Sequence, residues 1–303
     1  MAAQNLITQR DVIKKPQFVV EGTTAALYGV TPTNPVFVPI GRDATLVEAP
    51  TPTKAELRTS GNVDKQRNDL TREVNTVALN FKVTASDFDI LKWFSNVPNG
   101  AITADETRSF IWSYTNNAGV ETFQRFLGCQ PLDSTITEDN EGYVIIDATL
   151  TCQSIVEDTT GPTIGSGSFA TPLTVAPLTH KDSGATPFTY NTVVTEVENF
   201  AITVTFVYAE QNSISATQKL YSKPTQRVIT GSSIIFKKNL TIQADAKAVT
   251  ERAAIFVLKS TATTMTYTFA GFVFTPSGEE MSGDIAEATK ENKSWESNTV
   301  VLA

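Results

Sequence analysis

One stretch, residues 76–96, combines two hydrophobic periods and so restricts the fold more than any other. Apolar residues alternate with polar ones at Val77, Leu79, Phe81 and Val83, which is the period of a strand with one buried face. Thr84 and Asp87 then stand at capping-box spacing, with Asp in place of the usual Glu. Helical spacing follows at Phe88, Leu91 and Phe94, and Asn96 and Pro98 end the helix.

A second unit of this kind is predicted at residues 233–256. The alternating positions are Ile234, Phe236, Leu240 and Ile242. Asp245 is the predicted N-cap, and the helical stripe is Val249, Ala253 and Phe256. Residues 80–83 align with residues 239–242 at a shift of 159, and Thr122-Phe123 aligns with Thr268-Phe269 at a shift of 146. The repeat predicts one β-rich domain written twice.

The chain divides accordingly. We predict a first β domain with an N-terminal arm over residues 1–158, a Gly/Pro/Ser/Thr-rich linker over 159–187 and a second β domain over 188–303. The only histidine, His180, lies in the linker, where we expect it to be solvated. A chain of 303 residues has room for two such cores.

Composition narrows the class further. The net charge of −8 argues against wrapping nucleic acid, which needs Lys and Arg to displace counterions. No apolar run approaches the ~20 residues of a membrane helix, and the first 20 residues hold no secretory h-region. We therefore expect synthesis and assembly in the cytoplasm of a host.

Two cysteines, Cys129 and Cys152, are predicted to lie opposite each other if their segments form a hairpin turning at Asn140-Glu141. A disulfide or a soft metal pair is then conceivable. No third or fourth ligand lies near, which argues against zinc. The simpler interpretation is two small apolar side chains on a buried strand face, kept reduced.

Residues 50–73 form a long polar segment between two predicted strands. Loops of this length inside a compact domain are usually functional or mobile. We interpret the segment as a contact arm that reaches a neighbouring subunit through ion pairs of mixed sign. Its charged residues are Lys54, Glu56, Arg58, Asp64, Lys65, Arg67, Asp69, Arg72 and Glu73.

No catalytic constellation stands out. One histidine leaves Ser-His-Asp, Cys-His and histidine-rich metal sites without a base or ligands. No GxGxxG or GxxxxGK[ST] motif opens a helix, and the glycine cluster at residues 161–167 lies in the linker. We expect no enzyme activity, no cofactor and no metal.

The segment from residue 21 to residue 96 resembles the tail tube proteins of phages and related viruses with long non-contractile tails. The resemblance rests on the run from Tyr28 to Phe37, on the loop with Arg58-Thr59-Ser60 and residues 65–70, and on the strand and helix ending at Leu91. It implies two tandem β-sandwich or barrel domains, each with one short flanking α-helix. The second half matches only through the internal repeat.

The resemblance also implies a function. Sheets of adjacent copies would join edge to edge into rings, and the rings would stack into a hollow virion tail tube that conducts viral DNA during ejection. Two tube domains per chain imply a homotrimer that forms a pseudo-hexameric ring. The implied partners are other copies of the chain, a tape measure protein and DNA in the lumen without sequence-specific binding, and tail terminator and distal tail proteins.

Two alternatives stay open. A distal tail or baseplate hub can use the same fold but caps one tube end. A β-sandwich capsid-decoration or carbohydrate-binding module would be a monomer with an exposed aromatic platform, for which Phe110, Trp112 and Tyr114 are the candidates. We expect those three side chains to lie on a buried face instead.

Overall fold

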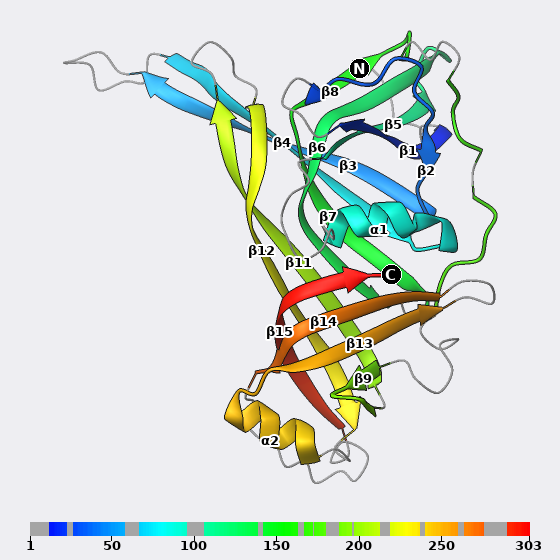
Figure 1. Ribbon diagram of the computed structural model, residues 1–303. Helices are drawn as coiled ribbons and strands as arrows, with labels where there is room; N and C mark the ends of the chain where they lie inside the picture. The colour runs from blue at the N-terminus through cyan, green and yellow to red at the C-terminus, as the bar shows by residue number, and fades with distance from the viewer. Residues whose placement is uncertain are drawn as a thin grey trace, which may run out of the picture.

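The computed structural model describes residues 12–22, 27–57, 67–95, 106–138, 142–162, 167–171, 173–179, 188–195, 197–212, 219–236, 240–259, 264–275 and 290–303. The protein is mainly β, as predicted, with two short helices beside an extensive antiparallel sheet system (Figure 1).

The first half holds β1 (Val12–Gly22), β2 (Val38–Pro39), β3 (Arg42–Leu57), β4 (Arg67–Lys82), α1 (Phe88–Ser95), β5 (Thr107–Thr115), β6 (Glu121–Glu138), β7 (Val144–Cys152) and β8 (Ser154–Asp158). The second half holds β9 (Phe188–Tyr190), β10 (Val193–Val194), β11 (Val197–Asn212), β12 (Lys219–Phe236), α2 (Leu240–Ala248), β13 (Arg252–Lys259), β14 (Thr264–Phe274) and β15 (Lys290–Leu302).

Both halves pair their strands in the same order. In the first half the order is β2-β1-β5-β6-β7-β4-β3. In the second half it is β10-β9-β13-β14-β15-β12-β11. The helix follows the fourth strand of each half, α1 after β4 and α2 after β12. Every strand of the second half therefore has a counterpart in the first.

The correspondence extends to single residues. The hairpins β3–β4 and β11–β12 keep one offset of 154 residues, and both carry a register shift at the same place, between Thr53 and Lys54 and between Val207 and Tyr208. A bulge follows Arg108 in β5 and Arg252 in β13. Shared irregularities of this kind fix the alignment more firmly than shared strand order, because bulges occupy defined positions in a fold.

The predicted second strand–helix unit was misplaced. Leu240 and Ile242, expected in a strand, lie in α2, whereas Ala253 and Phe256, expected in a helix, lie in β13. The shift of 159 is therefore wrong. The alternation of apolar residues around Lys238 resembled a continuing strand, while the chain has already turned into a helix of nine residues.

The first unit was predicted correctly. Thr84 and Asp87 form the capping box of a 3₁₀ turn that leads into α1, and Leu91 and Phe94 are fully buried. The Thr84 amide donates to Asp87 Oδ2 at 2.6 Å, and the Gly41 amide donates to Oδ1 at 2.9 Å. Burial raises the pKa of Asp87, and these hydrogen bonds oppose the rise.

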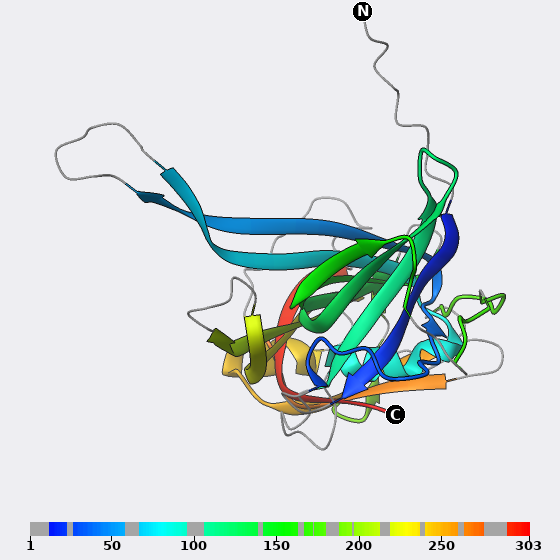
Figure 2. The same ribbon diagram turned by 90° about the horizontal axis from the view of Figure 1, so that it is seen from above.

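Two predicted loops are largely strand. The hairpin β3–β4 runs through residues 50–57 and 67–73, and β11–β12 runs through most of residues 209–230. Prolines and charges hid these strands, because neither face of a projecting hairpin needs to be apolar. Both hairpins extend toward the left-hand side of Figures 1 and 2, and β3–β4 reaches well beyond the rest of the molecule. Part of the predicted N-terminal arm, residues 12–22, is likewise strand β1.

One hydrophobic core spans both halves. It joins side chains such as Phe81, Phe94 and Ile136 with Ile202, Phe256 and Phe269. The boundaries predicted at 158 and 188 stay a prediction, since the sheet and the core both continue across them.

Candidate functional site

The two halves join edge to edge. The second part of β6 has β7 on one side and β11 on the other, and four residue pairs connect it to β11. The pairs are Ile136↔Ile202, Thr135↔Thr203, Ser134↔Val204 and Asp133↔Thr205. The hydroxyls of Thr135 and Thr203 lie 3.0 Å apart. The first half of the molecule thus accepts the leading strand of the second half at a sheet edge.

Two side chains of the second half reinforce this junction. Tyr208 donates its hydroxyl to the carbonyl oxygen of Pro131 at 2.5 Å. Arg227 of β12 donates from Nη1 to the carbonyl oxygen of Ser95 at 2.7 Å. Ser95 is the last residue of α1, so the cation meets free carbonyls and the negative end of the helix dipole.

The counterpart of β11 in the first half is β3, and its outer edge is open. Among the described residues, β3 has ladder pairing with β4 alone. Pro50 and Pro52 lie in this strand, and a proline cannot donate to a ladder, so even-numbered residues of β3 turn their nitrogens to the open side. At the offset of 154, Glu48 corresponds to Ile202, which pairs with β6.

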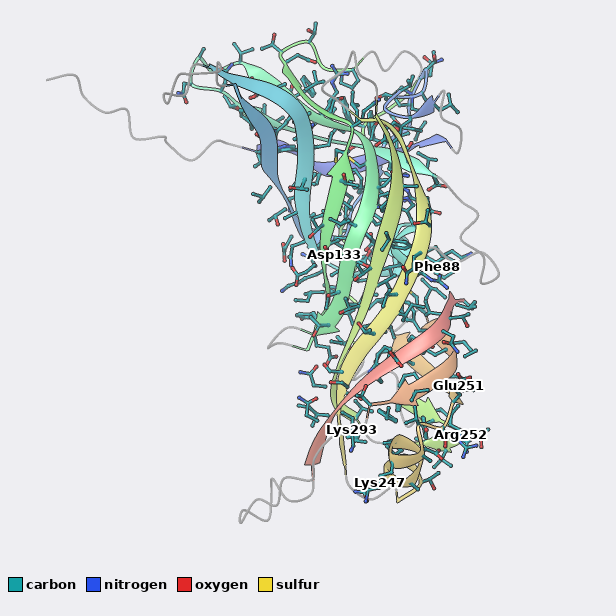
Figure 3. All side chains as sticks on the ribbon, turned by 90° about the vertical axis from the view of Figure 1, so that its left-hand side faces the viewer. Phe88, Asp133, Lys247, Glu251, Arg252 and Lys293 are labelled. Carbon is teal, nitrogen blue, oxygen red and sulfur yellow. The ribbon has the colours of Figure 1, made fainter. Side chains whose placement is uncertain are left out.

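One face of the joined sheet carries a row of polar side chains. Adjacent pairings connect Thr45, Asn80, Asp147, Thr135, Thr203, Thr230 and Glu296 across seven strands of both halves. Asn80 donates to Asp147 within this row. The opposite face is apolar, with Leu79, Val204 and Ile229 buried. Figure 3 views this sheet, with Asp133 in its middle.

Carboxylates dominate the charge on the polar face. Asp133, Asp147 and Glu296 lie on it with threonines and serines around them, and Lys82 stands at the end of β4. Two shallow depressions open on the same face, one over β3, β4, β6 and β7 and the other over β11, β12 and β15. A wide, flat, polar surface of this kind suits a wall better than a small-molecule site, which is normally concave and largely apolar.

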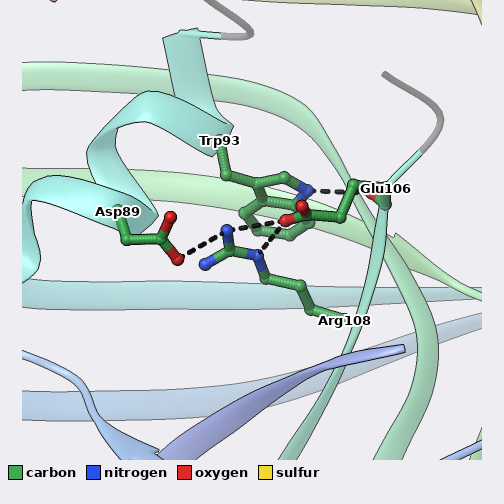
Figure 4. A network of polar contacts seen from close by, with 4 residues as sticks. All are labelled: Asp89, Trp93, Glu106 and Arg108. Carbon is green, nitrogen blue, oxygen red and sulfur yellow. Dashed lines mark hydrogen bonds and ion pairs between the residues drawn. The ribbon is translucent and has the colours of Figure 1, made fainter. Parts of the chain in front are cut away.

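A buried arginine ties α1 to the sheet. Arg108 is 1% exposed and lies 2.7 Å from Glu106 and 3.0 Å from Asp89 (Figure 4). Its guanidinium stacks over Trp93, whose Nε1 donates to the carbonyl oxygen of Glu106 at 2.9 Å. A saturated cluster of ion pairs and a cation–π contact fixes the helix and leaves no group to act on a substrate.

The second half repeats the arrangement with other residues. Arg252, the counterpart of Arg108, donates from Nε and Nη2 to the two carboxylate oxygens of Asp245 in α2, each at 2.9 Å. These bonds hold the pKa of Asp245 below its usual value. Tyr190 donates to the same carboxylate at 3.1 Å. Asp245, predicted as an N-cap, is thus a buried anchor within α2.

Sequence reasoning missed the most connected carboxylate, Glu21. It is buried at the end of β1 and accepts from the amides of Gly29 and Gly128, both at 2.9 Å, and from the hydroxyls of Thr107 and Ser109. These donors come from a loop and from β5 and β6. A lone glutamate beside a glycine carries no sequence signal for such a convergence.

The predicted contact arm falls on the projecting hairpin. Lys54 and Glu56 lie in β3, and Arg67, Asp69, Arg72 and Glu73 lie in β4. Their side chains, together with Arg58, Asp64 and Lys65, lie outside the described residues. The inter-ring role of this set stays a prediction.

The aromatic platform is not formed. Phe110 and Tyr114 are 0% and 2% exposed, and Trp112 donates from Nε1 to Gln124 at 2.6 Å. A binding module that relies on these three rings therefore loses its surface. His180 lies outside the described residues.

The two cysteines are free thiols on buried strand faces. The flanking pair Gln130↔Thr151 puts Cys129 and Cys152 opposite each other, as predicted from the hairpin register. Burial and the neighbouring Cys152 raise the pKa of Cys129 well above its usual value, so the thiol stays protonated. Within the described part of the chain, no group of three or more His, Cys, Asp or Glu side chains could hold a metal ion. Neither described helix is long and apolar enough to cross a membrane.

Comparisons with known proteins add little beyond this geometry. No family model matches the chain, and no curated protein matches it. Among solved structures, the baseplate of the anti-feeding prophage matches at 13% identity and a TM-score of 0.34, over 52% of this chain and 100% of that chain. The sheath–tube complex of an extracellular contractile injection system matches at 12% identity and a TM-score of 0.32, over 52% and 98% of the two chains. These values are too low to assign a function.

Proposed function

We propose that this chain is a structural subunit of a viral tail tube and that three copies close into a pseudo-hexameric ring. The observation that carries the proposal is the β6–β11 junction, where the first half accepts the second half at a sheet edge. The equivalent strand β3 has ladder pairing with β4 alone among the described residues. The same joint can therefore repeat between chains.

Repetition of one heterologous joint makes a ring if the rotation closes. In this ring, β3 of one chain adds to the end of β14 in the next, in a segment that corresponds to residues 133–136 of β6 and lies outside the described residues. An open strand edge is a hazard for a monomer and a ready interface for such an assembly.

The polar face becomes the inner wall. Its row of threonines and carboxylates continues across both halves without an apolar interruption, and ring closure extends it around the axis. Acidic side chains would keep DNA moving, because they repel phosphates and release no counterions. The tape measure protein, the tail terminator and the distal tail protein are proposed as further partners. The role needs no catalysis, cofactor or metal.

Negative-stain electron microscopy of the purified protein over a range of concentrations tests the proposal. We expect hollow tubes or stacked rings whose averaged end views show three subunits and six lobes. Single rings that never stack would favour a baseplate hub. Rings of six subunits, or monomers at every concentration in the presence of tape measure protein, would contradict the trimeric tube.

A further inference from the structure

We propose that successive chains also meet through an ion pair between Glu73 of β4 in one copy and Lys247 of α2 in the next. The partner is a second copy of this chain, so the inference rests on the proposed ring. It follows from applying to that ring the contacts that join the two halves within one chain.

The contact within the chain is the one between Arg227 and the C-terminus of α1. The guanidinium donates to the Ser95 carbonyl oxygen at 2.7 Å. Arg227 is partly buried, and this burial lowers the pKa of its guanidinium. A cation is the group that a helix C-terminus attracts. The leading hairpin of one half thus reaches the helix end of the half before it.

The strand register identifies the counterpart of Arg227. Residue 227 pairs with Phe206, and residue 73 pairs with Pro52, both within the offset of 154. The bulge that both hairpins share comes directly after these pairs, between residues 226 and 224 and between residues 72 and 70. Position 73, which holds a glutamate, is therefore the place that arginine occupies in the second half.

The helices identify the counterpart of Ser95. The buried residues Ile90, Trp93 and Phe94 of α1 match the buried residues Ile242, Asp245 and Ala246 of α2. Trp93 and Asp245, matched in this way, both contact the arginine of the following strand, Arg108 and Arg252. The next position is Ser95 in α1 and the exposed Lys247 in α2.

The two differences compensate each other in charge. A glutamate in the place of Arg227 would be repelled by a bare helix C-terminus. At the end of α2, however, Lys247 supplies a cation in the last turn. The arginine–carbonyl contact within the chain thus becomes a glutamate–lysine contact between chains. Figure 3 shows Lys247 at the α2 end of the molecule, remote from the β6–β11 junction, where a following copy would arrive.

Cross-linking in assembled protein tests the contact directly. Rings or tubes made from a mixture of unlabelled and ¹⁵N-labelled chains would be treated with a zero-length carbodiimide, which joins a carboxylate to an amine in direct contact. We expect peptides that join residue 73 to residue 247 and contain one light and one heavy member. Dispersed subunits below the assembly concentration serve as the control and should lack this product.

A charge exchange supplies the second readout. Glu73→Lys and Lys247→Glu should each raise the concentration needed for assembly about tenfold, as expected for a close interfacial pair. The double variant keeps the net charge of −8 and should return within about threefold of the wild type. Thermal melts of dispersed subunits would verify that each variant is folded.

The outcomes separate this inference from the proposed function. Wild-type rings in electron micrographs, without the 73–247 cross-link and with unchanged assembly of both single variants, would overturn the ion pair and leave the tube intact. A double variant that assembles no better than the worse single variant would also overturn it. A wild-type protein that forms no ring would overturn the tube, and the ion pair with it.

Discussion

Gly128 in β6 and Gly271 in β14 hold the same backbone conformation at corresponding positions of the two halves, with φ of 62° and 65°. Both directly precede the residue that faces the bulge arginine of the neighbouring strand, Cys129 opposite Arg108 and Phe272 opposite Arg252. The shift here is 143 residues, so the alignment at a shift of 146 was wrong by three. A left-handed residue at a bulge calls for glycine, which has no Cβ to strain.

Alanine at these glycines should destabilise the subunit unequally. At Gly128 a Cβ would lie 2.8 Å from the Gln153 Cβ and 3.2 Å from the Gly29 nitrogen. At Gly271 it would meet chiefly the exposed Asn298 side chain, which can rotate. We expect Gly128→Ala to cost about 3 kcal/mol and Gly271→Ala about 1.5 kcal/mol in urea unfolding. Equal losses would contradict the difference in packing.

Val249→Gly should stabilise the dispersed subunit. The Thr250 amide donates to the Asp245 carbonyl at 2.9 Å and the Val249 amide to that of Ala246 at 3.3 Å, which is a Schellman motif. Val249 holds φ of 51° there and is exposed, a conformation that costs a β-branched residue about 1–2 kcal/mol. We expect Tm to rise by about 2–4 °C. Val249→Ala, which keeps a Cβ, is the matched control and should gain less.

The Asp245–Arg252 pair should make stability depend on pH. The hydrogen bonds from Arg252 lower the pKa of Asp245 in the folded state, so its contribution is present above the unfolded pKa of about 3.9. The contribution is lost as pH falls through the lower folded pKa. Asp245→Asn should cost about 1.5–3 kcal/mol at pH 7, and the gap to the wild type should narrow below pH 4. A gap that stays constant down to pH 2.5 would contradict this assignment.

Glu48→Pro should block ring closure without unfolding the subunit. The Glu48 amide faces the open side of β3, so proline removes a donor that the β3–β4 ladder does not use. We expect loss of rings in micrographs with a Tm change of less than about 3 °C. Val47→Pro is the matched control. Its amide belongs to the ladder with β4, so it should lower Tm by a larger amount.

Reversing Arg67 and Arg72 together tests the projecting hairpin. Both residues lie in β4, in the part that extends beyond the body of the molecule (Figure 2). We expect Arg67→Glu with Arg72→Glu to weaken ring stacking more than folding, so that short stacks replace long tubes. An equal loss of thermal stability in the dispersed subunit would argue that these arginines support the fold instead.

Local patterns account for what the sequence by itself determined. Period-two alternation located β4, β5 and β11, and the Thr84–Asp87 capping box located the start of the first helical segment. The register of one hairpin put Cys129 opposite Cys152. Each of these depends on residues close in the chain or on a single turn, so the physical cause lies within the window that a sequence pattern samples.

Tertiary structure decided the rest, because it depends on contacts between distant residues. The hairpins β3–β4 and β11–β12 hold strands of polar, proline-containing sequence through backbone pairing, which leaves no apolar period to detect. Glu21 gathers donors that lie up to 107 residues away, and β11 finds the edge of β6 across 66 residues at Ile136 and Ile202. Such pairings are selected by the whole sheet and by burial on its apolar face.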